Sequence, residues 1–274
     1  MAPRNATEEE VVVRRYTQGE HIYVAEMCRP RVKNAFNDAM YQQLIQGIDE
    51  FEANDNLHVL VITGHGDFFT SGADLEHAFK GMDPTNDHVV LPSQGWPKKF
   101  MHKMLECKKV IAAAVNGRAI GIGVTLLLHC DFVFAAESAT FWTPFMRIGI
   151  VPEFASSYTF PNVLGPLVAN DLLMRSKTID IQRAVTCGLV SQVFPTANFL
   201  EQVFEELEPL VMDPIAKKAL PTYKSLGRRV RDPLVREALV AEYVELDRRF
   251  LSGETHKAAS QIIPLIRAAK NSKL

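Results

Sequence analysis

Two glycine-containing turns, each placed between an apolar run and a helix start, constrain the fold of this 274-residue chain most strongly. The first turn spans residues 68–75 and follows the strand-like run His58 to Thr63. The second spans residues 116–123 and follows Val110 to Val115. Continuous apolar runs of this kind are typical of strands covered on both faces. Strand–turn–helix units therefore predict an α/β fold.

Such turns also have a chemical consequence. A strand-to-helix turn leaves backbone N–H groups unpaired at the positive end of a helix dipole. Two of them in one domain can aim two N–H donors at one developing negative oxygen, as in an oxyanion hole. Either turn alone is better explained by glycines that only separate a strand from a helix. The pair, together with the carboxylate described below, favours the oxyanion hole.

The rest of the chain divides into a strand-and-helix part and a helical part. A hairpin is predicted over residues 11–27, and Asn37 is expected to cap a helix. Further helices are predicted from about Lys98 to Cys107 and over Val124 to Leu128, and almost throughout the chain beyond Pro166. Residues 81–97 are polar and lack periodicity, which indicates a loop.

We accordingly expect four segments. Residues 1–9 form a flexible N-terminus, 10–198 the α/β core, 199–265 a C-terminal helical region and 266–274 an exposed tail. The tail ends in Ser272-Lys273-Leu274, the tripeptide that a peroxisomal import receptor binds. The first ten residues are acid-rich and have no apolar core, so neither a secretory nor a mitochondrial leader is expected. The sequence therefore predicts a location in the peroxisomal matrix.

Composition argues against several kinds of partner. The formal net charge of −2 supplies no basic field for nucleic acid or an anionic membrane surface. No apolar run reaches the roughly 18 residues that a membrane span needs. The histidines show no HxH or HExxH spacing and the cysteines no CxxC pair. We therefore expect no nucleic-acid partner, no membrane span and no metal.

One carboxylate lies in an apolar segment. Glu153 is flanked by Ile150, Val151 and Phe154. Apolar surroundings raise the pKa of a carboxyl group, which suits a group that takes and returns a proton near neutral pH. Pro152 followed by Glu153 is also ordinary chemistry for the first turn of a helix. These residues alone leave both interpretations open.

Several segments, in this order and spacing, resemble the crotonase (enoyl-CoA hydratase/isomerase) superfamily over residues 10–260. The segments are Arg31–Met40, Phe69–Leu75, Asn116–Gly123, Ala139–Phe145 and Ser156–Pro161. Within the superfamily the chain is most similar to the peroxisomal Δ3,Δ2-enoyl-CoA isomerases. The resemblance implies a crotonase-like spiral of ββα units with a helical C-terminal trimerisation region. It also implies homotrimers or hexamers, a coenzyme A thioester as substrate, and no separate cofactor.

The resemblance also assigns residues by motif position. The thioester oxygen would be held by the backbone N–H groups of Ala73 and Ile122, and Glu153 falls where the isomerases place their single catalytic glutamate. Hydratases of the superfamily use two glutamates to position and split water, at positions that Thr125 and Phe145 occupy here. Phe154 replaces a common glycine, and its bulk is expected to affect the acyl pocket. The residues implied to bind substrate are Ser71, Gly72, Ala73, Asp74, Leu75 and Gly121.

The implied activity is the conversion of 3-enoyl-CoA to trans-2-enoyl-CoA in peroxisomal β-oxidation of unsaturated fatty acids. Glu153 would carry a proton from C2 to C4 of the acyl chain. Three alternatives stay open: a dienoyl-CoA isomerase with further acids in its pocket, a non-catalytic acyl-CoA-binding protein of the same fold, and an RNA-binding trimer with a basic surface.

Other charged residues are given structural roles. Asp74 is expected to cap a helix, and Asp131 to make structural hydrogen bonds. The basic residues from Lys217 to Arg231 are expected to form a solvated helix face. Contacts with coenzyme A phosphates from a neighbouring subunit are the alternative.

Overall fold

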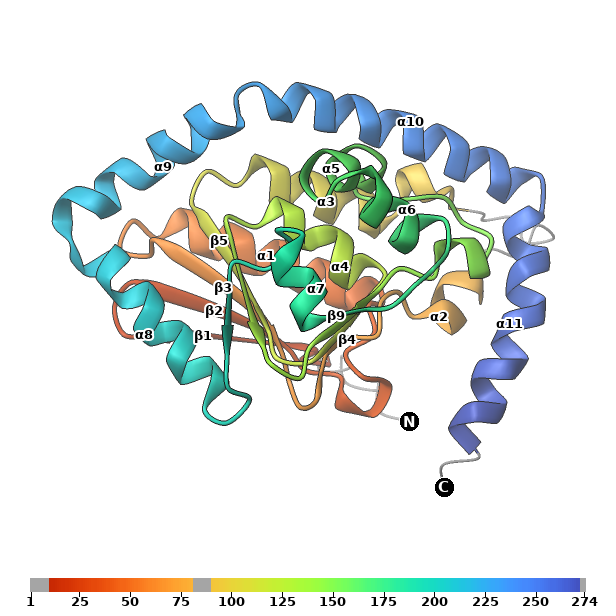
Figure 1. The fold of residues 1–274 in the computed structure, drawn as a ribbon, viewed down its shortest axis with the longest axis horizontal. Coiled ribbons are helices and arrows are strands. Elements are labelled where there is room, and N and C mark those ends of the chain that lie inside the picture. Colours follow the sequence, from red (N-terminus) through yellow and green to blue (C-terminus); the bar gives the residue numbers. More distant parts are fainter. Residues whose placement is uncertain (1–9, 81–89, 272–274) are drawn as a thin grey trace, which may run out of the picture.

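A repeated strand–strand–helix unit builds the protein, described here from a computed structural model that covers residues 10–80 and 90–271. Each unit places a long strand in a six-stranded sheet and a short strand in a four-stranded sheet, and then adds a helix (Figure 1). The units are β3 (Val59–Gly64), β4 (Phe68–Thr70) and α2 (Leu75–Lys80), β5 (Val110–Val115), β6 (Arg118–Ile120) and α4 (Ile122–Thr125), and β7 (Phe132–Ala136), β8 (Thr140–Trp142) and α5 (Ser156–Val163). The predicted ββα spiral is confirmed.

The remaining strands complete the two sheets. The large sheet has the order β1-β2-β3-β5-β7-β10, and the small sheet the order β4-β6-β8-β9. Among the strands that the structure describes, only β1 in the large sheet and β9 in the small one run antiparallel to their neighbours. The predicted hairpin corresponds to the first two strands. The added strands are β1 (Val13–Gln18), β2 (Ile22–Met27), β9 (Ile179–Asp180) and β10 (Gln192–Phe194).

The long strands are continuous apolar runs because both faces of the large sheet are covered. In β3, Val59 and Val61 face a cluster that includes Val203 and Leu207 of α8 (Phe199–Met212). The intervening Leu60 and Ile62 face the main core instead. Side chains alternate across a strand, so an entirely apolar strand requires apolar partners on both sides.

Several helices differ from the predicted bounds. Asn37 caps α1 (Asp38–Ala53) as predicted, because its side-chain oxygen accepts a hydrogen bond from the N–H of Met40 at 3.0 Å. Helix α3 (Trp96–Glu106) packs on α1 and begins earlier than predicted, with Pro97 inside its first turn. It follows the 3-10 turn η2 (Pro92–Gln94), so residues 90–97 are not one loop, and residues 81–89 lie outside the described residues. Helix α4 starts at Ile122 and changes at Leu126 to the 3-10 turn η3 (Leu126–His129).

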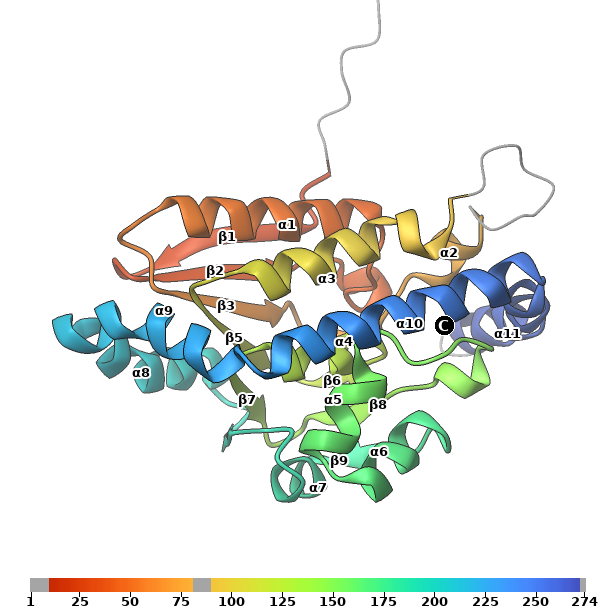
Figure 2. The ribbon, with the colours of Figure 1, turned by 90° about the horizontal axis from the view of Figure 1, so that it is seen from above.

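Helices of the C-terminal part wrap around the spiral. Figure 1 shows α9 and α10 as a long arc along one edge, and Figure 2 shows α10 passing over the core between α3 and α5. Residues 266–271, expected within an exposed tail, continue α11. The elements are α6 (Pro166–Leu173), α7 (Ile181–Thr186), α9 (Pro214–Arg228), α10 (Arg231–Leu251) and α11 (Glu254–Asn271).

Two cations of α9 correct the prediction of a solvated basic face. Lys224 and Arg228 are buried and form ion pairs with Asp131, at 2.9 and 2.6 Å. Asp131 also accepts a hydrogen bond from the N–H of Ile111 at 2.9 Å, which confirms its structural role. The prediction fails for these two residues because α9 packs against β5, so its inner face is covered.

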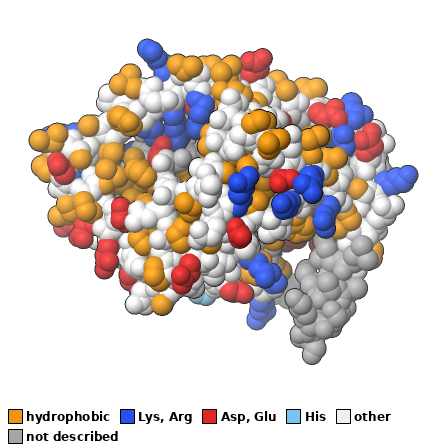
Figure 3. Space-filling view, in the orientation of Figure 1, with side chains coloured by type: hydrophobic (Ala, Val, Ile, Leu, Met, Phe, Trp, Pro, Cys, Tyr) orange, Lys and Arg blue, Asp and Glu red, His pale blue; other side chains and the backbone are white. Residues whose placement is uncertain are grey.

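The outer faces of α9 and α10 carry exposed apolar side chains. Figure 3 shows hydrophobic groups along the upper edge of the molecule, over these two helices. Among them are Ile215, Tyr223, Leu226, Val240 and Val244, and the exposed Val230 lies between the two helices. Within the described ranges, no helix is long and apolar enough to cross a membrane.

Candidate active site

The two glycine turns predicted from the sequence meet in the structure. Gly72 and Gly121 both have left-handed backbones, with φ of +86° and +57°. A Cβ on Gly72 would lie only 2.9 Å from the carbonyl oxygen of Ile120 and 3.7 Å from the Cα of Gly121. The backbones therefore approach as closely as they do because Gly72 has no side chain, whereas a Cβ on Gly121 would come no closer than 3.8 Å to another atom.

The first turn is held by the loop that follows β2. The N–H of Ser71 donates to the carbonyl of Lys33 at 2.8 Å, and the carbonyl of Gly72 accepts from Phe36 at 2.9 Å. The N–H of Asp74 donates to the carbonyl of Phe36 at 2.8 Å. Ala73 lies between these pairs, and no hydrogen bond between described residues uses its N–H.

The second turn is held by β8. The N–H of Gly121 donates to the carbonyl of Trp142 at 2.8 Å, and the carbonyl of Gly121 accepts from Val124 and Thr125. Ile122 is the first residue of α4, so its N–H has no partner in a preceding helical turn. None of the described residues accepts a hydrogen bond from it. Each turn thus leaves one backbone N–H unpaired.

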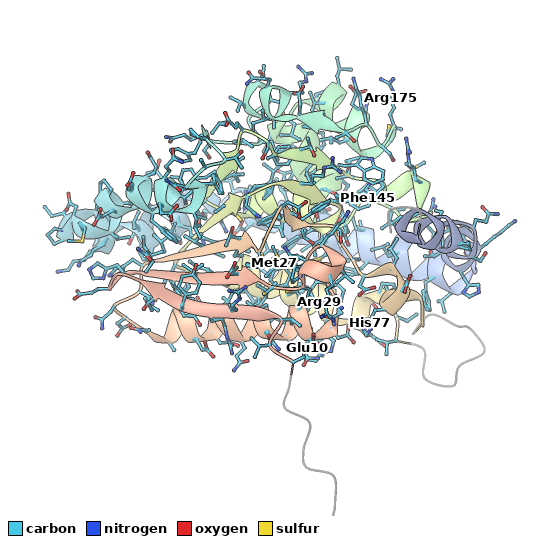
Figure 4. The ribbon with its side chains drawn as sticks, turned by 90° about the horizontal axis from the view of Figure 1, so that it is seen from below. Glu10, Met27, Arg29, His77, Phe145 and Arg175 are labelled. Carbon is cyan, nitrogen blue, oxygen red and sulfur yellow. The ribbon has the colours of Figure 1, made fainter. Side chains whose placement is uncertain are left out.

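The other residues of the first turn are engaged locally. The hydroxyl of Ser71 donates to the carbonyl of Val32 at 3.0 Å. Asp74 accepts from the N–H of His77 at 3.3 Å and pairs with Arg29 at 3.1 Å, and Figure 4 shows Arg29 and His77 in the same part of the molecule. The predicted capping role of Asp74 is confirmed. Leu75 begins α2 and is partly exposed.

Glu153 does not begin a helix, which corrects one of the two interpretations of the Pro152–Glu153 pair. It lies in an irregular segment between the 3-10 turn η4 (Phe145–Arg147) and α5. Helix α5 starts only at Ser156, because Phe154 and Ala155 both have left-handed backbones, with φ of +57° and +54°. A left-handed residue interrupts a right-handed helix, so the helix cannot extend back to Glu153.

The surroundings of Glu153 disfavour its charge. The side chain is partly exposed, yet burial, together with the charge of Glu242, raises its carboxyl pKa to about 8. Tyr41 and Tyr243 are buried nearby, and the charge of Glu153 adds to the effect of burial in raising their pKa values. The ring of Tyr41 lies 5.0 Å from the ring of Phe36, whose backbone holds the first turn. Tyr41 thus senses the charge of Glu153 and also packs on the residue that holds the first turn.

Two C-terminal helices border the segment that carries Glu153. On one side, Glu242 of α10 accepts hydrogen bonds from residues just after Glu153. On the other side, Gly149 has φ of +71°, and a Cβ there would lie 2.6 Å from the Cβ of Ala258 in α11. The site is therefore completed by helices distant in the sequence.

The two positions where hydratases of the superfamily are expected to carry glutamates hold no carboxylate in this chain. Thr125 is fully buried, and its hydroxyl lies 3.4 Å from the carbonyl oxygen of Ile122. Phe145 is also buried, and Figure 4 shows it in the interior of the molecule. Phe154 is buried as well, stacked on His129 with ring centroids 4.3 Å apart.

Two residues near the site were missed by the sequence analysis. His129 is fully buried, which lowers its pKa to about 3, so its ring is neutral at physiological pH. Glu242 is only 5% exposed, and it falls among Val235, Leu239 and Tyr243 on the buried stripe of α10. Glu242 could have been identified from the sequence as an acidic residue at an apolar position of a helix.

Two surface hollows lie apart from these residues. One, of about 400 Å³, is lined by Trp142, Ser176 and three cationic residues, of which Figure 4 shows Arg175 at the outer edge. The other, of about 520 Å³, is lined mainly by residues of α3, including Lys98 and His102. Within the described ranges, no three His, Cys, Asp or Glu side chains gather as a metal-binding group.

Known proteins place the chain in a family. The family model for enoyl-CoA hydratase/isomerase matches residues 17–261. Human enoyl-CoA delta isomerase 2 is 34% identical over 237 residues, which cover 84% of this chain and 58% of that protein. Mouse peroxisomal enoyl-CoA delta isomerase 3 is 36% identical over 180 residues, which cover 66% of this chain and 56% of that protein. The chain thus spans less than two thirds of the length of these curated relatives.

The fold has the same relatives. A solved enoyl-CoA hydratase/isomerase from Pseudoalteromonas atlantica T6c matches with a TM-score of 0.83 and 29% identity. The match covers 92% of this chain and 97% of that structure. By sequence and by fold, this chain belongs to the enoyl-CoA hydratase/isomerase family, the crotonase superfamily.

Proposed function

We propose that this protein is a Δ3,Δ2-enoyl-CoA isomerase, which converts 3-enoyl-CoA to trans-2-enoyl-CoA. The observation that carries the proposal is the combination of a partly exposed carboxylate, Glu153, whose pKa is raised to about 8, with two touching turns that each leave an N–H group unpaired. The names of the human and mouse relatives support the same activity.

The proposed reaction moves one proton. The thioester oxygen of the substrate accepts hydrogen bonds from the N–H groups of Ala73 and Ile122. Ionised Glu153 removes a proton from C2, and the electrons of that C–H bond form a dienolate with its charge on the thioester oxygen. Protonated Glu153 then gives the same proton to C4, so the double bond moves from C3–C4 to C2–C3. Each N–H donor of such a hole is typically worth about 3 kcal/mol in the transition state.

We favour isomerisation over hydration as the reaction, because the chain lacks the pair of glutamates with which hydratases activate a water molecule. Thr125 and Phe145 stand at the two positions where hydratases of the superfamily carry glutamates, and neither ionises as a carboxylate. A base that only returns its proton to the same substrate needs a pKa near neutrality, which fits Glu153.

Substrate binding is proposed for the first turn and the start of the second. Ser71, Gly72, Ala73, Asp74 and Leu75 would line the path of the pantetheine arm, and Gly121 the acyl side of the hole. We propose that no separate cofactor takes part, since coenzyme A belongs to the substrate and Glu153 carries the proton. Activity unchanged after dialysis against a chelator would support this.

Turnover of trans-3-hexenoyl-CoA, followed as the absorbance of the conjugated thioester, tests the proposal. Wild type is compared with Glu153→Gln, which keeps the shape of the side chain but cannot take a proton. Glu137→Gln is the matched control, because Glu137 is an exposed acid in the turn after β7. We expect Glu153→Gln to lose activity by several orders of magnitude while binding acyl-CoA, and Glu137→Gln to behave as wild type.

Other outcomes point to the alternatives. A wild type that binds hexenoyl-CoA without turnover indicates a non-catalytic acyl-CoA-binding protein. Turnover of a 3,5-dienoyl-CoA but not of 3-hexenoyl-CoA indicates a dienoyl-CoA isomerase. A Glu153→Gln variant as active as wild type refutes the role given to Glu153.

Assembly and location are part of the proposal. The exposed apolar side chains of α9 and α10, such as Leu226 and Val240, support a homotrimer or hexamer built through these helices. Light scattering should give three or six times the mass of 30.7 kDa. The name of the mouse relative and the Ser272-Lys273-Leu274 tripeptide support import into the peroxisome. Deletion of the tripeptide should disperse a fluorescent fusion into the cytosol.

A further inference from the structure

One peptide group next to Glu153 is held from both sides. The carbonyl of Phe154 accepts a hydrogen bond from Nε2–H of His129 at 2.7 Å. The N–H of Ala155, in the same peptide group, donates to Oε2 of Glu242 at 2.7 Å. His129 comes from η3 and Glu242 from α10, so two separate parts of the chain fix this one peptide.

Fixing this peptide matters because its neighbours are conformationally unfavourable. Phe154 and Ala155 both lie in the left-handed region, which residues with a Cβ rarely adopt. Two consecutive residues of this kind persist only where surrounding contacts hold them. Their conformation sets the direction in which the preceding residue, Glu153, presents its side chain.

Glu242 contributes more than one of these contacts. Its Oε1 accepts from the N–H of Ser157 at 2.9 Å and from the hydroxyl of Ser157 at 2.6 Å. Three donors thus converge on one carboxylate that is only 5% exposed. A buried acidic side chain with three donors on two oxygens is a specific device and does not serve as packing alone.

We propose that Glu242 is a positioning residue for Glu153: by holding Ala155 and Ser157, it fixes the backbone that aims the catalytic carboxylate. The inference rests on the proposed function, since it acts through the base of that reaction. His129 supports the same peptide from the opposite side. The titratable groups that face Glu153 are Tyr41, Tyr243 and Glu242 itself.

The main test is Glu242→Gln, assayed for trans-3-hexenoyl-CoA turnover. Glutamine has the same size, but one carboxylate oxygen becomes an NH₂ group that cannot accept from Ala155 or Ser157. We expect kcat to fall by about 10- to 100-fold, as a misplaced catalytic group causes. KM should change by less than about threefold, since Glu242 does not line the proposed path of the substrate.

Glu237→Gln is the matched control, because Glu237 is exposed on the same helix. It should keep the kcat of wild type. Ser157→Ala removes only the hydroxyl donor from an exposed position, and should lower kcat by about threefold, as the loss of one hydrogen bond does. The melting transition shows whether Glu242→Gln folds. If it does not, the kcat of Ser157→Ala tests the positioning role of Glu242 instead.

The double variant Glu153→Gln/Glu242→Gln separates positioning from stability. If Glu242 acts through Glu153, the double variant should be no less active than Glu153→Gln alone. A folded Glu242→Gln variant with the kcat of wild type overturns the inference and leaves the proposed function standing, provided that Glu153→Gln is inactive. A wild type without isomerase activity overturns the proposed function, and this inference with it.

Discussion

Gly72 and Gly121 face each other at a separation that leaves no room for a side chain on Gly72. A Cβ on Gly72 would lie 2.9 Å from the carbonyl oxygen of Ile120, closer than real Cβ atoms approach a carbonyl. The two turns come from different ββα units, so this contact sets the position of one unit of the spiral relative to the next. It also fixes where the N–H groups of Ala73 and Ile122 lie relative to each other.

Gly72→Ala should therefore impair activity more than stability. The new methyl group would push the first turn from the second, so we expect kcat/KM for 3-hexenoyl-CoA to fall by about 100-fold, as for a lost oxyanion-hole donor. Gly66→Ala is the matched control, because Gly66 has a similar φ of +82° but nothing within 4 Å of its Cβ position. Both variants share the cost of a left-handed alanine, about 1 kcal/mol. Equal activities of the two would contradict the close contact.

Glu153 should make the folded protein less stable as the pH rises. Its pKa is raised from 4.5 to about 8, so between these values the folded protein keeps a proton that the unfolded chain releases. The contribution of Glu153 to stability is therefore present at low pH and lost as the pH approaches 8. Glu153→Gln cannot lose this contribution. We expect the variant to gain in melting temperature relative to wild type between pH 5 and pH 8.5. A difference that does not depend on pH would contradict the raised pKa.

His129 should have the opposite dependence on pH. Burial lowers its pKa from 6.5 to about 3, so between these values the unfolded chain binds a proton that the folded protein does not. Wild type should therefore lose stability as the pH falls below 6.5, because His129 then takes up a proton only in the unfolded chain. His129→Gln lacks this dependence, although it is less stable overall. The gap in melting temperature between the two proteins should narrow from pH 7 to pH 5, and a gap that stays constant over this range would contradict the lowered pKa.

The sequence predicts those parts of the fold that depend on local patterns. The runs that form β3 and β5 were identified because burial on both faces leaves a continuous apolar signature. Asn37 was identified because a helix cap is a contact between residues three positions apart. The glycine turns were identified because a tight strand-to-helix turn restricts its residue types locally.

What the sequence does not predict depends on contacts between distant residues. The short strands β4 and β6 have three residues each, and they are defined by pairing with each other. Helix α5 begins after Ala155 because His129 and Glu242 hold a left-handed peptide there, and no local pattern records that. The role of Ala73 and Ile122 came from the resemblance to a family, and it remains a prediction.

A second consequence of distant contacts can be tested at Asp131. Its carboxylate joins β7 to the inner face of α9 through Lys224 and Arg228, whose side chains are only 5% and 11% exposed. Asp131→Asn would leave two buried cations without a counter-charge, which costs about 3 kcal/mol or more. We expect a clear loss in the free energy of unfolding, measured by denaturant titration.

Asp171→Asn provides the comparison, because Asp171 also pairs with two cations. Those partners, Arg175 and Lys177, have side chains that are 71% and 57% exposed, so water replaces the lost carboxylate charge. We expect this variant to unfold at nearly the same denaturant concentration as wild type. If both substitutions had equal effects, the docking of α9 on the sheet would not depend on the charge of Asp131. A loss confined to Asp131→Asn would show that a partly buried carboxylate anchors the C-terminal helices to the core.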